Sequence, residues 1–235
     1  MNDSPSSPAI SSTMREYLGE VYRCHHRGER ATTGLLASRL GVSLPAVAKM
    51  FTRLDKAGYL RREPYQGVSL TSAGEREALR SIRRHRLLEV FLVKVMGFGW
   101  EETHDHSHAL EGAVSDALED RMDEMTGHPT RCPHGDPIPT KDGVMPVVDD
   151  VCLIDCAPGA SGTLSRVRTH DPDKLRYLAS LRLTPGAPIA VRNRAPFNGP
   201  VRVASAGAEH VLGAELASTL FVELNQGKTT GASGV

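Results

Sequence analysis

Histidines and acidic residues recur at helical spacing in two neighbouring stretches of the chain. In the first stretch, His85 and Glu89 are four residues apart, so a helix would place one above the other on the same face. In the second stretch, His104, His108 and Glu111 fall within a sector of about 60° at the helical advance of about 100° per residue. Imidazole and carboxylate groups together form a ligand set for divalent cations. The two stretches therefore predict a metal site, provided that the helices carrying them pack face to face.

Further possible ligands lie outside these two stretches. Cys132 and His134 flank a proline in a segment rich in Pro and Gly, where a thiolate and an imidazole could bind the same ion as Glu89. An acidic residue of the first predicted helix, Glu16 or Glu20, could complete the His/Glu group. The alternative interpretations are a solvated polar helix face for the histidines and an ordinary turn for Cys-Pro-His. Each signal is weak alone, and their combination favours metal binding.

The elements that must position these residues follow from the periodicity of apolar side chains and from capping residues and glycines at their ends. Two short alternating runs around a Pro/Gly turn at 59–71 predict a β-hairpin. From residue 151 onward, short β-rich runs predict a small β-barrel, in which Cys152 and Cys156 are expected in the core. The predicted helices cover approximately residues 14–22, 34–40, 45–57, 72–96 and 100–125.

The second and third predicted helices, joined by a tight turn at Gly41 and followed by the hairpin, have the pattern of a winged helix-turn-helix. In such a module the second helix enters the major groove of DNA with its N-terminal residues facing base edges. Lys49 can donate to guanine acceptors, and Pro45 and Ala46 can pack on a thymine methyl. The alternative is a three-helix domain with a solvated basic face. The predicted DNA contacts are Ser43, Pro45, Ala46 and Lys49 toward the bases, and Arg53, Lys56, Arg61 and Arg62 toward the phosphates.

The distribution of charge supports a polyanionic partner although the formal net charge is zero. Residues 1–75 contain ten Lys/Arg against seven Asp/Glu, whereas residues 101–126 contain one against nine. A neutral total therefore hides a basic N-terminal part. No apolar run approaches the roughly 20 residues that span a bilayer, and the polar N-terminus lacks the features of a secretory signal. A cytoplasmic protein with reduced cysteines and no membrane partner is therefore expected.

These observations predict a mainly α-helical protein with a small β domain, and its order of segments resembles that of a known family. The matching segments, within residues 13–225, are Glu16-Tyr17-Leu18, Ser43-Leu44-Pro45, Leu70-Thr71-Ser72-Ala73-Gly74, Arg84-His85-Arg86-Leu87-Leu88-Glu89, His108 with Glu111, and Cys132-Pro133-His134-Gly135. They are similar to segments of the diphtheria-toxin-repressor family, including its manganese-responsive branch. The resemblance implies a winged helix-turn-helix, a helical dimerisation domain and a C-terminal SH3-like (FeoA-like) β-barrel.

Combining both lines of reasoning, we expect six regions. They are a disordered arm at 1–12, the DNA-binding domain at 13–72, the dimerisation and metal-binding domain at 73–130, a ligand-bearing linker at 131–150, the barrel at 151–225 and a disordered tail at 226–235.

Carried over by position, the resemblance implies two metal sites. The sequence departs from the family at one point. Members of the family carry an adjacent Glu-His pair, which is Glu111-Gly112 in this sequence, so the first site lacks one imidazole. His108 replaces a Glu or Cys of other members and can compensate, and Glu16 stands where the manganese branch has Asp and the iron branch has Met. The first implied site consists of Glu16, His85, His108 and Glu111; the second consists of Glu89, Cys132, His134 and Asp171, with His104 matching a histidine of the corresponding site in the iron branch.

The function implied is a homodimeric regulator in which bound metal fixes the angle between the DNA-binding and dimerisation domains. Two recognition helices about 34 Å apart would then match a palindromic operator on double-stranded DNA. The nitrogen and oxygen donors of the first site favour Mn(II), with Fe(II) as the alternative, and the cysteine would also suit Zn(II).

Other classes of function were weighed against this one. A winged-helix regulator that answers to an organic ligand is the nearest alternative, and a protein whose basic face binds another partner is a further one. An enzyme is not expected, because a metallohydrolase centre would leave the winged helix unexplained and the sequence has no HExxH motif. No small-molecule substrate is therefore expected.

Overall fold

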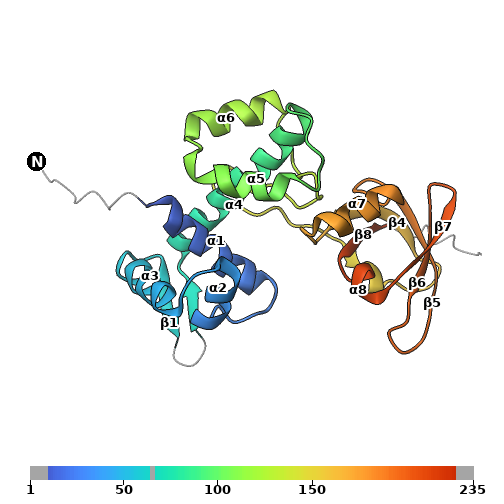
Figure 1. The fold of residues 1–235 in the computed structure, drawn as a ribbon, viewed down its shortest axis with the longest axis horizontal. Helices are drawn as coiled ribbons and strands as arrows, with labels where there is room; N and C mark the ends of the chain where they lie inside the picture. The colour runs from blue at the N-terminus through green and yellow to red at the C-terminus, as the bar shows by residue number, and fades with distance from the viewer. Residues whose placement is uncertain (1–9, 64–66, 226–235) are drawn as a thin grey trace, which may run out of the picture. The chain divides into compact units, whose positions relative to one another are not determined.

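A computed structural model describes residues 10–63 and 67–225 of the chain (Figure 1). The chain divides into two compact units, one within residues 1–96, 105–130 and 138–146 and the other within 97–104, 131–137 and 147–235. The first unit is helical apart from one hairpin, and the second is built on an antiparallel sheet, as the predicted fold class requires. Most of the predicted arm, the tip of the predicted wing and the predicted tail lie outside the described residues. No described helix is long and apolar enough to cross a membrane.

Three helices and a hairpin form the N-terminal part of the first unit, and each helix begins at a predicted kind of cap. The hydroxyls of Ser11, Thr32 and Ser43 accept hydrogen bonds from backbone N–H groups in the first turns of their helices. Gly41, at φ 63°, ends the second helix in the left-handed conformation that glycine adopts without strain. The elements are α1 (Ser12–His26), α2 (Thr33–Leu40), α3 (Leu44–Lys56), β1 (Leu60–Glu63) and β2 (Gly67–Leu70).

The apolar faces of these elements meet in one core. Its largest fully buried side chains include Leu18 of α1, Leu36 of α2 and Leu54 of α3. Strands β1 and β2 pair antiparallel with Leu60 opposite Leu70, so the hairpin is held directly against the helices. The winged helix-turn-helix predicted from local sequence chemistry is therefore formed.

The remainder of the first unit is helical, but the helix predicted over 100–125 is broken. The segment consists of α5 (Thr103–Leu110), a 3₁₀ turn η1 (Glu111–Ala113) and α6 (Asp116–Met125), which follow the long α4 (Ser72–Lys94). The break arises because Gly112 favours helix poorly and the Ser115 hydroxyl accepts a hydrogen bond from Leu118 N, starting a new helix. The break places Glu111 in a turn, which changes the direction of its side chain.

Buried ion pairs hold α6 against α4. The Arg83 and Arg84 guanidinium groups each bind the Glu119 carboxylate, at 2.9 and 2.8 Å, and Arg84 also binds Asp116. Removing Glu119 would leave two buried cations without this partner, which is costly inside a protein. Near these pairs Leu88, Val114 and Met122 form a small apolar cluster.

The second unit is a six-stranded antiparallel sheet in the order β3-β8-β4-β5-β6-β7. In the part of the chain that the structure describes, no pairing joins β7 to β3, so the predicted barrel is an open sheet. Leu164, Leu175 and Leu183 belong to its core, as does the predicted core residue Cys156, whereas Cys152 is partly exposed. The elements are β3 (Val151–Cys152), η2 (Leu153–Asp155), β4 (Ser161–Val167), α7 (Pro172–Ser180), β5 (Pro188–Arg194), β6 (Val201–Ser205), β7 (Ala208–Leu212), α8 (Ala214–Ala217) and β8 (Leu220–Leu224).

The predicted linker at 131–150 contains no helix or strand longer than one bridge, yet parts of it are closely packed. Asp150 binds the guanidinium of Arg166 on β4 through both carboxylate oxygens, at 2.7 and 2.5 Å. Gly135, at φ 87°, lies so close to β4 that an added Cβ would stand 1.9 Å from the carbonyl oxygen of Ser165. These contacts fix the segment that carries Cys132 and His134 on the sheet of the second unit.

Candidate metal centre

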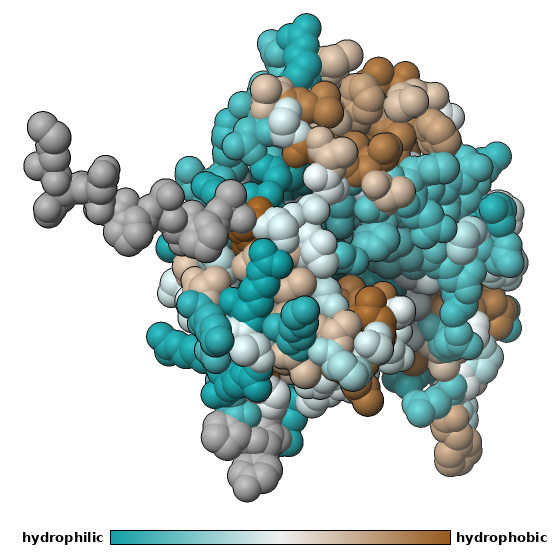
Figure 2. Space-filling view, turned by 60° about the vertical axis from the view of Figure 1, so that its left-hand side comes forward, coloured by the Kyte–Doolittle hydropathy of each residue, from teal (hydrophilic) through white to brown (hydrophobic). Residues whose placement is uncertain are grey.

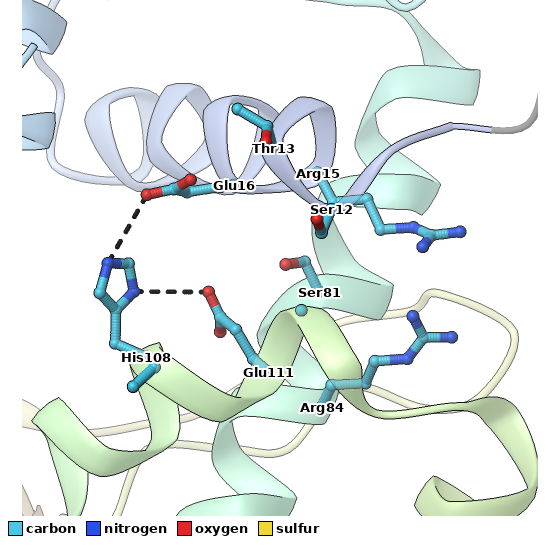
Figure 3. Close-up of a pocket in the computed structure, with 10 residues that line it drawn as sticks. Ser12, Thr13, Arg15, Glu16, Ser81, Arg84, His108 and Glu111 are labelled. Atoms are coloured by element: carbon cyan, nitrogen blue, oxygen red, sulfur yellow. Dashed lines mark ion pairs between the residues drawn. The ribbon is translucent and has the colours of Figure 1, made fainter.

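Four of the predicted ligands, from four different elements, lie together in the first unit. Figure 3 shows three of them, Glu16, His108 and Glu111. The Glu111 carboxylate is the centre of the group: one oxygen is 2.9 Å from His85 Nδ1 and the other is 3.5 Å from His108 Nδ1. His108 Nε2 is in turn 3.6 Å from a carboxylate oxygen of Glu16. Because η1 follows α5 directly and α1 packs against α4, these side chains converge although almost 100 residues separate the first from the last.

His85 occupies the buried end of this group, with 6% of its side chain exposed. Its Nε2 atom is 3.2 Å from Glu89 Oε1, so the same imidazole contacts one residue of each implied site. Burial lowers the pKa of His85, but the carboxylates of Glu89 and Glu111 outweigh this effect and raise the pKa to about 9. His85 therefore holds a proton at neutral pH in the metal-free protein, and a bound divalent ion would replace that proton.

The other end of the group is open to solvent, since the His108 side chain is 56% exposed. Burial raises the pKa of Glu16, an effect that the nearby His108 opposes. Burial raises the pKa of Glu111, but the hydrogen bond to His85 and the positive charges of His85, Arg23 and His108 together lower it below its ordinary value. Two carboxylates and two imidazoles are joined here in a chain of contacts from Glu16 through His108 and Glu111 to His85, and donors of these kinds fit the ligand preferences of Mn(II), Fe(II) or Zn(II).

Of the two acidic residues suggested in the first helix, Glu16 lies at this group. Glu20 is instead paired with Arg23 and Arg39, at 3.2 and 3.0 Å. Sequence spacing could not separate the two residues, because they are one helical turn apart and lie on the same face of α1.

A cavity of about 200 Å³ adjoins Glu16, His108 and Glu111. Its other polar lining residues include Ser12, Ser81, Arg15 and Arg84, which lie on the side away from His108 in Figure 3. Gly112 also lines this cavity.

A second group of predicted ligands lies in the second unit. His134 is fully buried and donates from Nε2 to the carbonyl oxygen of Trp100 at 3.0 Å. His170 stacks on His104, with ring centroids 3.7 Å apart, and meets His134 edge-on at 5.5 Å. Sequence reasoning missed His170, although its position next to the predicted ligand Asp171 was a signal.

Asp171 has a structural role in this unit. Its carboxylate caps α7 by accepting hydrogen bonds from Asp173 N and Lys174 N, at 3.0 and 3.2 Å. Cys132 is buried two residues before His134. The imidazoles of His104, His134 and His170 thus gather within the second unit, and Asp171 is at the adjoining helix start.

The side chains predicted to contact DNA differ in their contacts within the protein. Pro45, Ala46, Lys49, Arg53, Lys56 and Arg61 are exposed. The Ser43 hydroxyl caps α3, and Arg62 binds Thr52 at 2.5 Å and Asp55 at 3.7 Å, so it ties the wing to α3. Val42 and Leu44, which the sequence analysis did not select, expose apolar surface beside the start of α3.

Comparisons with known proteins agree with this arrangement. Residues 9–68 match the family model described as "Iron dependent repressor, N-terminal DNA binding domain", and residues 71–140 match "Iron dependent repressor, metal binding and dimerisation domain". Residues 151–224 match the FeoA domain.

Similar proteins extend over nearly the whole chain. The iron-dependent repressor IdeR of Mycobacterium tuberculosis is 30% identical over 227 residues, which cover 91% of this chain and 98% of the relative. A solved manganese-dependent transcriptional repressor in complex with manganese is 37% identical, with a TM-score of 0.84, and the match covers 90% of this chain and all of that one. The structure of ScaR with bound Cd²⁺ is 30% identical, with a TM-score of 0.76 and coverage of 89% and 98%.

Proposed function

The chain belongs to the iron-dependent repressor family, which includes the diphtheria toxin repressor, and we propose that within this family it is a manganese-responsive regulator that binds a palindromic operator as a dimer. Members of the family are metal-dependent transcriptional repressors rather than enzymes. The observation that carries the proposal is the convergence of Glu16, His85, His108 and Glu111.

The mechanism rests on the position of Glu16 on the first helix of the DNA-binding part. Burial raises the pKa of Glu16 in the metal-free protein, and the negative charge of Glu111 adds to this increase. Glu16 and Glu111 would help to hold a divalent cation, whose positive charge would offset that of the two carboxylates. Glu16 would then hold α1 against η1, which would fix the helix-turn-helix relative to α4–α6. The conformer that fits two operator half-sites is favoured in proportion to its greater affinity for the metal.

Manganese is proposed because the group contains only oxygen and nitrogen donors. Iron is the second candidate, and solved relatives named for manganese and a curated relative named for iron both resemble the chain. Operator binding measured by fluorescence anisotropy, in titrations with Mn(II), Fe(II) and Zn(II), tests the proposal. We expect binding to strengthen on metal addition and to weaken with a chelator; affinity independent of all three metals would overturn the metal-dependent regulation.

A second metal site is proposed from the resemblance and the ligand chemistry, with Glu89, Cys132 and His134 as its main donors and His104 and Asp171 as further ones. His170 is added to this set because it contacts both His104 and His134.

The thiol of Cys132 allows the second site to be tested by absorption spectroscopy. In the Co(II)-loaded protein we expect a thiolate-to-cobalt charge-transfer band, because a coordinated thiol is deprotonated. Cys132→Ser should abolish the band, and Cys152→Ser, which replaces a partly exposed cysteine of the second unit, should retain it. A band that survives Cys132→Ser would remove Cys132 from the site.

The basic side chains of α3 are proposed to read and hold the operator. We expect Lys49→Ala to weaken operator binding by about 1–3 kcal/mol, roughly 5- to 150-fold, at every metal concentration, because a base contact would be lost. Arg53→Ala should weaken binding to all DNA sequences alike and reduce the salt dependence by about one ion. Operator and scrambled duplexes titrated at two salt concentrations distinguish these effects. Equal losses on both duplexes would argue against a base contact by Lys49.

An apolar surface on the first unit is proposed as the dimer interface. The ends of α4 and α6 are joined by a hydrogen bond from Lys94 Nζ to the carbonyl oxygen of Thr126 at 3.2 Å. Met96 and Leu118 are half exposed, as are Val95 and Met125, and Figure 2 shows hydrophobic side chains gathered at the top of the molecule, where α6 lies in Figure 1. A patch of this kind favours association with another protein surface.

A further inference from the structure

Gly112 lies where η1 meets the first turn of α1, directly beside the metal candidate Glu111. A Cβ atom at this position would stand 3.2 Å from the Cβ and 3.5 Å from the Oγ of Ser12, which is a tight contact. Glycine therefore lets η1 approach α1 closely, and it also contributes no side chain to the space next to the cluster. That space is the cavity of about 200 Å³.

The cavity is suited to water. Its volume has room for several water molecules, each of which occupies about 30 Å³ in the liquid. The hydroxyls of Ser12 and Ser81 line the side opposite His108, and they can each donate and accept hydrogen bonds (Figure 3). The cavity thus places a space with polar lining groups, large enough for water, beside the carboxylates of Glu16 and Glu111.

The number of protein donors at the cluster determines whether a bound ion needs a further ligand from this space. Glu16, His85, His108 and Glu111 are four ligand residues, which is the number that a tetrahedral ion such as Zn(II) takes in a closed structural site. Manganese prefers octahedral coordination, so four single donors leave positions that another ligand must fill. The polar cavity beside the cluster is where such a ligand has room.

We propose that Gly112 keeps part of the manganese coordination sphere open to water from this cavity, and that it thereby determines selectivity between six-coordinate cations and zinc. The inference rests on the proposed metal-binding function of the same cluster. Water in this position suits an octahedral cation, whereas an additional imidazole from residue 112 would replace water by a nitrogen donor. Nitrogen donors strengthen zinc binding more than manganese binding.

Water-proton relaxation of the Mn(II)-loaded protein tests the proposal, because fast-exchanging water on Mn(II) raises the relaxation rate of the solvent. The amount of bound manganese is measured in parallel by equilibrium dialysis, and the rate is expressed per bound ion. The wild-type protein should show at least one exchangeable water at the cluster. Gly112→His should lower that number by one or more and should shift the ratio of zinc to manganese affinity at least roughly tenfold toward zinc.

Two further variants separate the effect of the donor from that of crowding. Gly112→Ala adds only the methyl group that meets Ser12, so it should retain the bound water even if metal affinity falls. Gly34→Ala, in α2 with no atom within 4 Å of the added Cβ, should resemble the wild type in every measurement. The relaxation rate of Glu111→Gln gives the contribution of manganese bound elsewhere on the protein, and this contribution is subtracted from the rate of the wild type.

The outcomes are distinguishable. Equal water counts in the wild type and in Gly112→His, with manganese bound to both, would overturn the role of Gly112 and leave the proposed function intact. A wild-type protein that binds no manganese in dialysis would contradict the proposed manganese function itself. Thermal unfolding followed by circular dichroism checks that Gly112→His remains folded. If it does not, Gly112→Ser provides the comparison, through its ratio of zinc to manganese affinity and its number of bound waters. Gly112→Ser is expected to hold fewer waters per manganese ion than the wild type.

Discussion

Glu111→Gln is expected to abolish the stimulation of operator binding by metal, with a loss of roughly 100-fold or more in the affinity measured at saturating Mn(II) for the wild type. The Glu111 carboxylate contacts two imidazoles of the cluster, those of His85 and His108. The amide has nearly the same shape but carries no negative charge, and it can no longer balance a divalent cation or the protonated His85. Weak binding to DNA without metal should be unchanged, since the basic side chains of α3 are untouched.

The matched control for this variant is Asp105→Asn, which makes the same chemical change on the exposed surface of α5. Asp105→Asn should retain full metal stimulation. Both proteins are titrated with manganese in fluorescence anisotropy on an operator duplex, and metal affinity is measured separately by calorimetry. If Glu111→Gln kept wild-type metal stimulation, Glu111 would not be part of the sensor.

Leu118→Glu is expected to convert the dimer to a monomer and to lower operator affinity by roughly 100-fold or more even at saturating metal. Leu118 is 47% exposed on α6, within the apolar surface proposed as the interface. In a dimer with twofold symmetry each substitution is present twice, so two carboxylates would be buried in the same interface. A monomer reaches a single operator half-site and loses the binding energy of the second.

Sedimentation equilibrium measures the first part of this prediction, and anisotropy on duplexes with one or two half-sites measures the second. Val211→Glu replaces an equally exposed valine on β7 of the second unit and should remain dimeric. Wild-type affinity for the single half-site in Leu118→Glu would show that the variant is folded. A Leu118→Glu protein that remained fully dimeric would place the interface elsewhere on the molecule.

Much of the candidate site could be predicted from sequence because its chemistry is local. His85 and Glu89 are one helical turn apart, and any helix over that segment brings them together. The same holds for the caps of α1–α3, where a hydroxyl three residues before an N–H group is sufficient. The identity of His85, His108 and Glu111 as candidate ligands followed from residue type and periodicity alone.

Other features depended on contacts between distant segments. The prediction of one helix over 100–125 was wrong, because apolar and acidic periodicity continues across the segment while Gly112 and the capping Ser115 interrupt it. The choice of Glu16 over Glu20 followed from the arginines of α1 and α2 that engage Glu20. His170 was missed because its neighbours His104 and His134 are more than 30 residues away in sequence.

The sequence by itself determined the winged helix-turn-helix and the kinds of ligand available, since both depend on interactions within one or two helical turns. Only the tertiary structure decided which carboxylates share an imidazole and what space lies beside Gly112. These depend on packing between α1, α4 and η1, which are joined by long-range burial rather than by any local pattern. The sequence therefore supplies the candidate donors, and the fold joins Glu16, His108 and Glu111 in one chain of contacts.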